Sequence, residues 1–188
     1  MKAVLVSVRP KWCKLIFEFL GYDNRRPLYK KRLELRKSAP KETPFRGYIY
    51  CTKDNTDLVP SRIWWKKDKT GFEHILNGMV VGEFVCDYVV RHCETENAYL
   101  AEEMSCVPRR DILNYSKGKE VFGWHISDLV IYDKPKELRE FRRYPRTEHC
   151  GFGECELCQH GDYDQLDDEW FCRNYIARAP QSWCYVED

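Results

Sequence analysis

The chain has 188 residues, of which 32% are charged, and its formal net charge is only +1. This length suits one domain with insertions, and the near-neutral total argues against a protein that binds by net charge alone. The charges are unevenly distributed, because residues 1–47 contain thirteen Lys or Arg and four Asp or Glu, whereas residues 147–169 contain eight Asp or Glu and no Lys or Arg. The sequence therefore predicts a basic N-terminal part that faces polyanions and a separate acidic segment.

The hydropathy pattern predicts neither an export signal nor a membrane span. The first apolar run ends at Val8, which is too short for the core of a signal peptide. No later stretch approaches the roughly 20 apolar residues of a spanning helix. We therefore expect a cytoplasmic protein that has no contact with a membrane. In such a compartment, ten cysteines serve as metal ligands where they cluster and as small buried side chains where they are scattered.

The first third of the chain predicts three strands and one helix. The expected elements are a buried strand over residues 3–8, a helix from Pro10 to Gly21, and strands over residues 32–36 and 45–52. In the second strand, Leu33 and Leu35 face one way, while Glu34 and its flanking arginines face the other way.

The rest of the chain predicts further strands separated by short helices. The expected elements are a long strand over residues 79–90 with Gly82 as a bulge, two short helices over 95–117 broken at Pro108, one or two strands over 121–133, a short basic helix after Pro135, and a final strand over 181–187. This order predicts the α+β class, with a small, mixed, partly closed barrel. The sequence contains no G-x-G-x-x-G, P-loop, H-E-x-x-H or G-x-S-x-G motif, which disfavours dinucleotide enzymes, NTPases, zincins and serine hydrolases.

Six segments of the chain together resemble a known family. They are VLVSVRPKW, KKRLELRKSAPK, YIYCTK, VVGEFVCD, FGWHISDLVIYDKPKEL and RAPQSWCYVE. The sequence resembles the activating-signal-cointegrator homology (ASCH) domains of the PUA-like superfamily, especially the small phage and prophage members. The resemblance implies one ASCH domain over residues 1–188, built as a PUA-like mixed β-barrel flanked by short helices. It also implies insertions at about 53–78, a Cys-rich flap at about 147–173, and binding of RNA or other nucleic acid.

The family pattern Gly-x-Lys-x-x-Glu-x-Arg matches the chain at Lys31, Glu34 and Arg36, although the glycine beside the lysine is missing. Some distant members of the superfamily are amidohydrolases that act on N-acetylated cytidine, with a threonine nucleophile where this chain has Glu34. Metal-dependent ribonuclease activity is also associated with the family. A hydrolase acting on RNA or on a modified nucleoside, with Lys31 and Glu34 as the reacting pair, is therefore an alternative to a binding protein. A neighbouring arginine weakens a carboxylate as a base, which favours binding.

A nucleic-acid site is expected in a basic cleft. Cationic side chains would hold phosphates, while Glu34 would hold an arginine side chain in place or accept a hydrogen bond from the edge of a base. Tyr50 or Trp124 would stack on bases. The expected binding residues are Ser7, Arg9, Lys31, Glu34, Arg36, Lys37, Tyr50, Trp124, His125, Gln181 and Ser182. Each of these binding roles has a plainer alternative. The strand with Glu34 could have a solvated face with one salt bridge, Trp124 could lie in the core, and His125 could have a structural role. Trp12 and Trp183 are expected in the core.

The cysteines from residue 150 onward have the spacing of a metal site. Cys150, Cys155, Cys158 and Cys172 would give four thiolates to a structural Zn²⁺, which would fold a segment that has few apolar residues. A [2Fe–2S] cluster and free thiols are the alternatives. Four protein ligands leave no open coordination position, so the flap would be structural, and its acidic surface makes a protein-interaction adaptor a third functional hypothesis.

Overall fold

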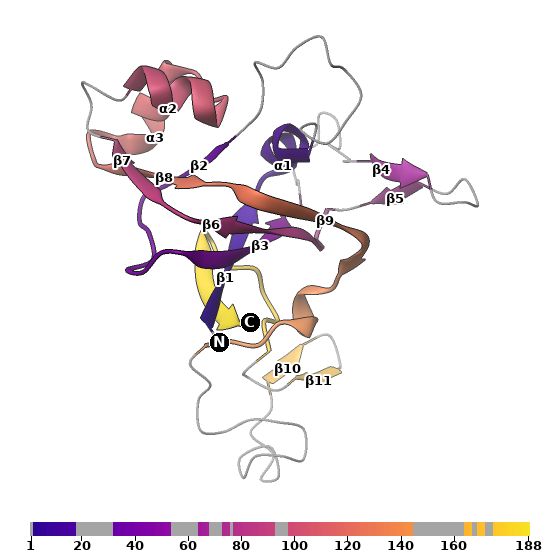
Figure 1. The fold of residues 1–188 in the computed structure, drawn as a ribbon. Helices are drawn as coiled ribbons and strands as arrows, with labels where there is room; N and C mark the ends of the chain where they lie inside the picture. The colour runs from indigo at the N-terminus through magenta and orange to yellow at the C-terminus, as the bar shows by residue number, and fades with distance from the viewer. Residues whose placement is uncertain are drawn as a thin grey trace.

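The computed structural model describes residues 2–17, 32–53, 64–67, 73–75, 77–92, 98–144, 164–166, 169–171 and 175–188. In chain order (Figure 1), its elements are β1 (Lys2–Val8), α1 (Pro10–Phe17), β2 (Leu33–Arg36), β3 (Phe45–Cys51), β4 (Trp64–Lys67), β5 (Glu73–Ile75), β6 (Val80–Cys86), β7 (Val89–His92), α2 (Ala98–Ser105), α3 (Arg109–Ser116), β8 (Val121–His125), β9 (Ser127–Lys136), the 3₁₀ helix η2 (Leu138–Glu140), β10 (Asp164–Leu166), β11 (Glu169–Phe171) and β12 (Trp183–Glu187).

The main sheet has five strands in the order β12-β1-β3-β6-β9. The first strand lies beside the last one, so Val4 is opposite Tyr185 on one side and Gly47 on the other. The β1–β3 pair is parallel, and the other neighbours are antiparallel. β1 has Val4, Val6 and Val8 on one face and Ala3, Leu5 and Ser7 on the other, and residues 3–8 are all buried, as expected for a strand that is covered on both sides.

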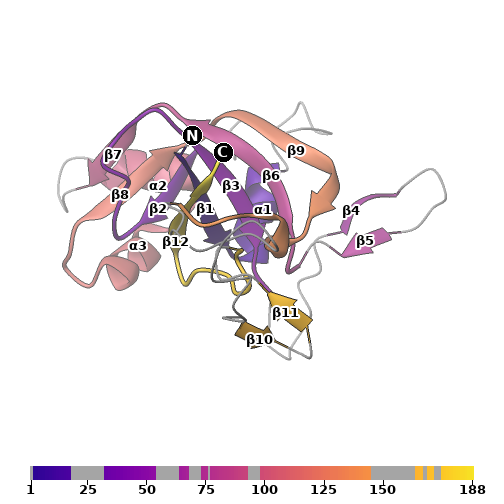
Figure 2. The same cartoon turned by 90° about the horizontal axis from the view of Figure 1, so that it is seen from below.

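The second sheet has three strands in the order β2-β8-β7. Only Ile126 separates β8 from β9, so the chain passes directly from the small sheet into the large one. The Ile126 amide donates to the Arg32 carbonyl at 2.8 Å, which holds the start of β2 at this junction. Seen from below, the strands curve around a common interior (Figure 2), and α1, α2 and α3 lie toward the same end of the molecule (Figure 1). The predicted α+β class and the mixed sheet are confirmed.

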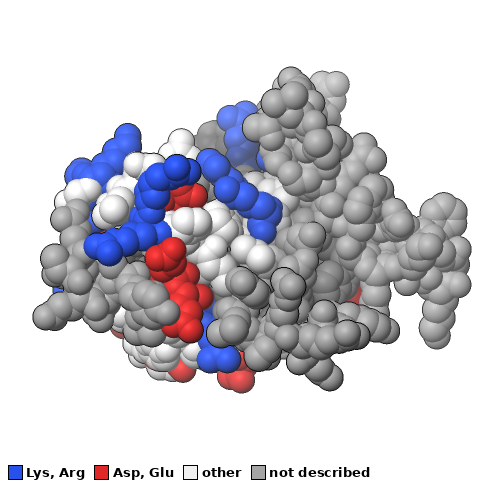
Figure 3. Space-filling view, turned by 90° about the horizontal axis from the view of Figure 1, so that it is seen from above, with Lys and Arg blue, Asp and Glu red and all other residues white. Residues whose placement is uncertain are grey.

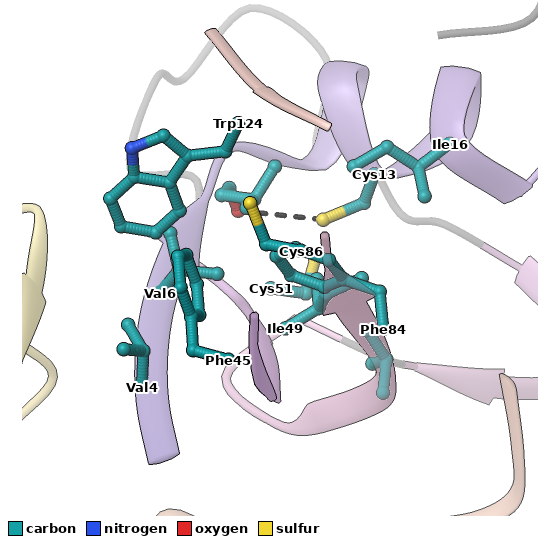
Figure 4. Close-up of a cluster of buried hydrophobic side chains, with 12 residues drawn as sticks. Val4, Val6, Cys13, Ile16, Phe45, Ile49, Cys51, Phe84, Cys86 and Trp124 are labelled. Atoms are coloured by element: carbon teal, nitrogen blue, oxygen red, sulfur yellow. Dashed lines mark hydrogen bonds between the residues drawn. The ribbon is translucent and has the colours of Figure 1, made fainter. Parts of the chain in front are cut away.

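The main core lies between the two sheets and under α1. Trp124 is fully buried there and makes edge-to-face contacts with Phe45 and Trp183, at centroid distances of 5.2 Å and 5.6 Å. Figure 4 shows that Val4 and Val6 from β1 approach the same cluster as Phe45 and Trp124. A second core packs Leu35 against the helices α2 and α3. The strand β2 therefore lies between two packed layers.

Two expectations about elements need correction. The single strand expected over residues 79–90 is two strands in different sheets, because the chain turns at Asp87 and Tyr88. The helix expected after Pro135 is a strand end followed by one 3₁₀ turn. The plainer alternative for β2, a solvated strand face, is excluded, since all four of its residues are buried.

Three of the scattered cysteines are buried in the core, as the sequence predicts. Cys13, Cys51 and Cys86 are fully buried in the main core (Figure 4). Burial raises the pKa of the Cys86 thiol to about 12, which keeps this thiol protonated. Among the residues that the structure describes, no helix is both long and apolar enough to span a bilayer.

Candidate functional site

An open cavity of about 960 Å³ lies at the end of the molecule where β1 meets α1. Its sides come from four parts of the chain: the β1–α1 junction, β2 with the residues that follow it, helix α3, and the segment before β12. The lining residues are Ser7, Arg9, Lys11, Trp12, Glu34, Leu35, Arg36, Lys37, Ser38, Thr52, Val107, Asp111, Ile112, Asn114, Tyr115, Pro180, Gln181 and Ser182. Segments far apart in the sequence therefore form one concave surface.

A buried ion pair forms part of the cavity wall. Arg36 Nη2 lies 2.7 Å from Glu34 Oε1, and both side chains are only 8% exposed. The same Nη2 donates to the Ser7 carbonyl at 2.7 Å, and Nη1 donates at 3.4 Å to both the carbonyl and the hydroxyl of Ser182. One guanidinium thus joins β2, the end of β1 and the segment before β12. Because an arginine fork is planar and rigid, it holds these three elements in a fixed relation.

Ser7 and Ser38 anchor the segment that precedes β12. The Ser7 hydroxyl donates to the Pro180 carbonyl at 2.6 Å, and the Ser7 amide donates to the Ser182 carbonyl at 2.9 Å. Farther along, Trp183 Nε1 donates to the Ser38 hydroxyl at 3.1 Å. These bonds hold the segment against the end of β1, while Gln181 between them is exposed at the rim.

Two aromatic side chains on different helices line the cavity, and each has an ammonium group over its ring. Lys11 Nζ lies 4.4 Å from the centroid of Trp12 on α1. Lys37 Nζ lies 4.9 Å from the centroid of Tyr115 on α3. The Trp12 ring also packs against both hydrophobic cores, so it is held firmly. Burial raises the pKa of Tyr115, so its hydroxyl is neutral at physiological pH.

The charge of the lining is positive. Four cations, Arg9, Lys11, Arg36 and Lys37, face two carboxylates, Glu34 and Asp111, which gives a difference of +2. Three of the cations are exposed, and the fourth is neutralised within the buried pair. Seen from the side of the helices, Lys and Arg side chains surround a recess in which neutral and acidic atoms are visible (Figure 3). Such a recess attracts anions.

The cavity brings together most of the residues that were predicted to bind nucleic acid. Those that line it are Ser7, Arg9, Glu34, Arg36, Lys37, Gln181 and Ser182. Lys31 lies outside the described residues. Trp124 is buried in the main core, and Tyr50 is buried in a separate hydrophobic cluster. These two expected stacking groups do not line the cavity. They are therefore not placed to stack on a ligand, because alternation along β3 and β8 turns them inward.

His125 also lies away from the cavity lining. Its Nδ1 is 2.6 Å from Asp87 Oδ1, and its ring stacks on Tyr88 at a centroid distance of 4.4 Å. The hydrogen bond with His125 holds the pKa of the Asp87 carboxyl below its usual value. These contacts fit the structural role that was the plainer alternative for this histidine.

Sequence reasoning missed the aromatic residues of the site. Trp12 was expected in the core, yet it both packs against the core and lines the cavity. Asp111, Asn114 and Tyr115 were not singled out at all. The signal for them was weak: helix α3 buries Ile112 and Ser116, and the remaining polar face gives no indication that another element lies opposite it.

The predicted zinc ligands Cys150, Cys155, Cys158 and Cys172 lie outside the described residues. Within the ranges that the structure describes, no three His, Cys, Asp or Glu side chains come close enough to hold a metal ion. The zinc site therefore stays a prediction from the spacing of the cysteines.

Solved structures with a similar arrangement are ASCH proteins. One is the ASCH protein from Zymomonas mobilis, with 16% identity over 72% of this chain and 73% of that chain and a TM-score of 0.48. A tyrosine-to-phenylalanine mutant of that protein gives 16% identity over 73% and 77%, with a TM-score of 0.49. A serine-to-alanine mutant of it gives 17% identity over 72% and 74%, with a TM-score of 0.48. No protein-family model matches the sequence, and no curated protein matches it.

Proposed function

We propose that the protein binds RNA or another single-stranded nucleic acid in the 960 Å³ cavity. The observation that carries this proposal is the combination of three exposed cations with two aromatic rings in one concave, positively charged surface. Cations that grip phosphates and rings that stack on bases are the two components of single-strand binding sites.

The shape of the site favours a single strand over a duplex. Its aromatic rings are on the walls of a recess, so a base must enter the recess to reach them. A paired base cannot do so, because a duplex exposes only base edges, which are read by elements that protrude into a groove. Unpaired bases can leave the stack and lie against aromatic side chains.

Hydrolysis by Lys31 and Glu34 has less support. A general base must come within hydrogen-bond reach of the proton that it removes. The Glu34 Oε1 atom instead accepts from Arg36 at 2.7 Å, and the carboxylate side chain is 8% exposed. The contacts of Glu34 are those of a group that positions an arginine, so turnover of RNA or acetylated cytidine is not expected.

The test is a salt titration of binding to a labelled single-stranded oligonucleotide, followed by fluorescence anisotropy. Each phosphate contact contributes about −0.7 to the slope of log K against log salt for single strands. Three exposed cations, Arg9, Lys11 and Lys37, therefore predict a slope of about −2. Each of the changes Arg9→Gln, Lys11→Gln and Lys37→Gln should make the slope shallower by about 0.7.

Lys134→Gln is the matched control, because Lys134 is an exposed lysine on β9 that does not line the cavity. This variant should keep the parent slope. An affinity that does not depend on salt, or a slope that changes as much in the control as in the cavity variants, would refute the proposed site. Turnover of the RNA probe that is lost in Glu34→Gln, with binding retained, would replace binding by hydrolysis as the function.

The four clustered cysteines would hold a structural Zn²⁺ in addition to this binding site. The support is their spacing, with Cys155 and Cys158 separated by two residues and one further thiol on each side, Cys150 before them and Cys172 after them. Elemental analysis of the purified protein should give about one zinc per chain. Replacing Cys155 and Cys158 by serine should remove it, whereas replacing the buried Cys13 by serine should not. Iron in place of zinc would overturn the assignment.

A further inference from the structure

The two aromatic residues of the cavity share an arrangement that a simple phosphate grip does not require. Each ring has the ammonium group of a neighbouring lysine over its face: Lys11 over Trp12 at 4.4 Å, and Lys37 over Tyr115 at 4.9 Å. All four side chains line the same cavity. One pair is on α1 and the other joins the end of β2 to α3. The site thus contains the same chemical unit twice, on two different walls.

Each unit matches one nucleotide. A lysine over an exposed ring is a weaker contact than a base stacked on that ring. Lysine also has a long, flexible stem, and its ammonium is a compact charge that suits a phosphate. An arriving nucleotide can therefore take the ring face with its base, while the displaced ammonium moves to its phosphate. The exchange keeps the cation paired and adds a stack, so it is favourable at both rings.

The size of the cavity agrees with more than one occupant. Pockets that bury a whole drug-sized ligand have volumes of roughly 300 to 1,000 Å³, and this one is about 960 Å³. A single base with its ribose is at the small end of that range of ligands. The cavity is open to solvent at the rim, where Arg9 and Gln181 are exposed, so a strand can enter and leave.

We infer that the cavity holds two consecutive nucleotides of one strand, one at the Trp12–Lys11 pair and the other at the Tyr115–Lys37 pair. This inference rests on the proposed function and specifies its ligand as a dinucleotide step. The buried Glu34–Arg36 pair serves as a rigid support for the cavity wall and takes no part in either stack.

The two units differ in rigidity. Trp12 packs against both hydrophobic cores, whereas Tyr115 is 37% exposed. The tryptophan unit is therefore preorganised and should bind one nucleotide by itself. The tyrosine unit should contribute only when a second nucleotide is linked to the first, since a linked group binds at a high effective concentration.

The experiment measures competition by short strands against a labelled oligonucleotide. The competitors are 5′-phosphorylated strands of one to six nucleotides in which all four bases are equally represented, in separate ribose and deoxyribose series. Affinity should rise at least about fivefold from one nucleotide to two, because a stacked base is worth about 5- to 150-fold. Counted per possible register of the strand, it should rise less than about threefold from two nucleotides to six, since the described residues place no third ring in the cavity lining.

Variants assign each nucleotide to a unit. Tyr115→Leu and Lys37→Gln should remove the step between one and two nucleotides and should lower the mononucleotide affinity by much less than Lys11→Gln does. Lys11→Gln should weaken every length, and it leaves the packing of Trp12 in place. Leu113→Gln and Lys119→Gln are the controls, because both residues are exposed near or on α3 outside the cavity lining, and both variants should behave like the parent.

Three results would overturn the inference. Equal affinity for one and two nucleotides would show a single-nucleotide site, and a continued rise beyond three nucleotides would show an extended groove. A step that survives in Tyr115→Leu would assign the second nucleotide elsewhere. A different outcome would refute the proposed function itself. In that outcome no strand of any length competes, and Lys11→Gln does not change the affinity for the labelled oligonucleotide.

Discussion

Arg36→Met should destabilise the protein more than any substitution of an exposed charge. Arg36 is buried, and its guanidinium contacts Glu34 at 2.7 Å and the Ser7 carbonyl at 2.7 Å. Methionine has a similar apolar volume but no charge and no donors. The substitution leaves the Glu34 carboxylate buried beside an apolar side chain, and it removes a donor from the Ser7 carbonyl.

The magnitude follows from these contacts. Removing one partner of a buried ion pair costs about 3 to 5 kcal/mol, because the other charge stays buried without that partner. Domains of this kind have free energies of unfolding of about 5 to 15 kcal/mol, so the loss is a large fraction of the total. With a urea m-value of about 2 kcal/mol/M, the midpoint of unfolding should fall by about 2 M.

A second substitution separates charge from shape. In the double variant Glu34→Leu with Arg36→Met, neither side chain is charged, and replacement of a whole buried pair by apolar residues is often neutral. The double variant should therefore recover most of the stability that Arg36→Met loses. The assay is equilibrium urea unfolding followed by circular dichroism, in the presence of a reductant because the chain has ten cysteines.

Two results would refute this reasoning. A loss below about 1 kcal/mol in Arg36→Met would be the value of an exposed pair, and Glu34 and Arg36 would then not be buried together in solution. A double variant as unstable as the single one would show that the shape of Arg36 matters and that the buried carboxylate does not. Arg36→Lys offers an internal comparison, since it keeps the charge but loses the planar fork.

Three other predictions concern the core and the titrating groups. Gly82→Ala should cost about 1 to 3 kcal/mol in the same urea assay, because an added Cβ would lie 2.4 Å from a backbone carbonyl of β9. Burial first, and then the hydrogen bond to Asp188, raise the pKa of Tyr48 to about 12. The pKa of Tyr48 in the folded protein thus exceeds the unfolded value of about 10. The stability that this hydroxyl contributes is therefore complete below pH 10 and is lost as the pH rises toward 12. In Tyr48→Phe, the free energy of unfolding should fall less steeply between pH 9 and 12. The pKa of Asp87 is lowered by its hydrogen bond with His125. The stability that this carboxylate contributes is therefore present above its unfolded pKa and is lost as the pH falls through its folded pKa. In Asp87→Asn, the free energy of unfolding should fall less steeply at acid pH, and an unchanged acid dependence would contradict this interpretation of the contact.

The fold was predictable where burial dominates the sequence pattern. The runs that became β1 and β3 were located to within two residues, since nearly all of their positions are buried, and β12 was located equally well although only Val186 in it is buried. The division between β6 and β7 was not predictable, because Asp87 and Tyr88 interrupt the apolar run for only two residues. The parallel pairing of β1 with β3 has no local signal either, because it depends on contacts between distant segments.

The candidate site was predictable on one side only. The strand β2 was located, and Glu34 and Arg36 were expected on the wall of a cleft, but alternation alone left a solvated strand face as the alternative. In the structure that face is covered by the end of β1 and the segment before β12, which no pattern within β2 indicates. The wall formed by α3 was missed for the same reason, since the exposure of Tyr115 to a cavity depends on what lies across from it. Local periodicity reports which residues are apolar, and it does not report which elements face each other.

The bonds that close the cavity join residues far apart in the chain, and this has a consequence for synthesis on the ribosome. The Ser7 hydroxyl bonds to Pro180, 173 residues later, and Arg36 bonds to Ser182, 146 residues later. Contacts of this separation form late, because a long loop must close before they are made. While β12 is still inside the ribosome exit tunnel, β1 has an open edge and the segment that completes the cavity is absent. The wall formed by Pro180, Gln181 and Ser182 is therefore missing until β12 has left the tunnel, so the cavity reaches its final shape only at the end of this chain's synthesis.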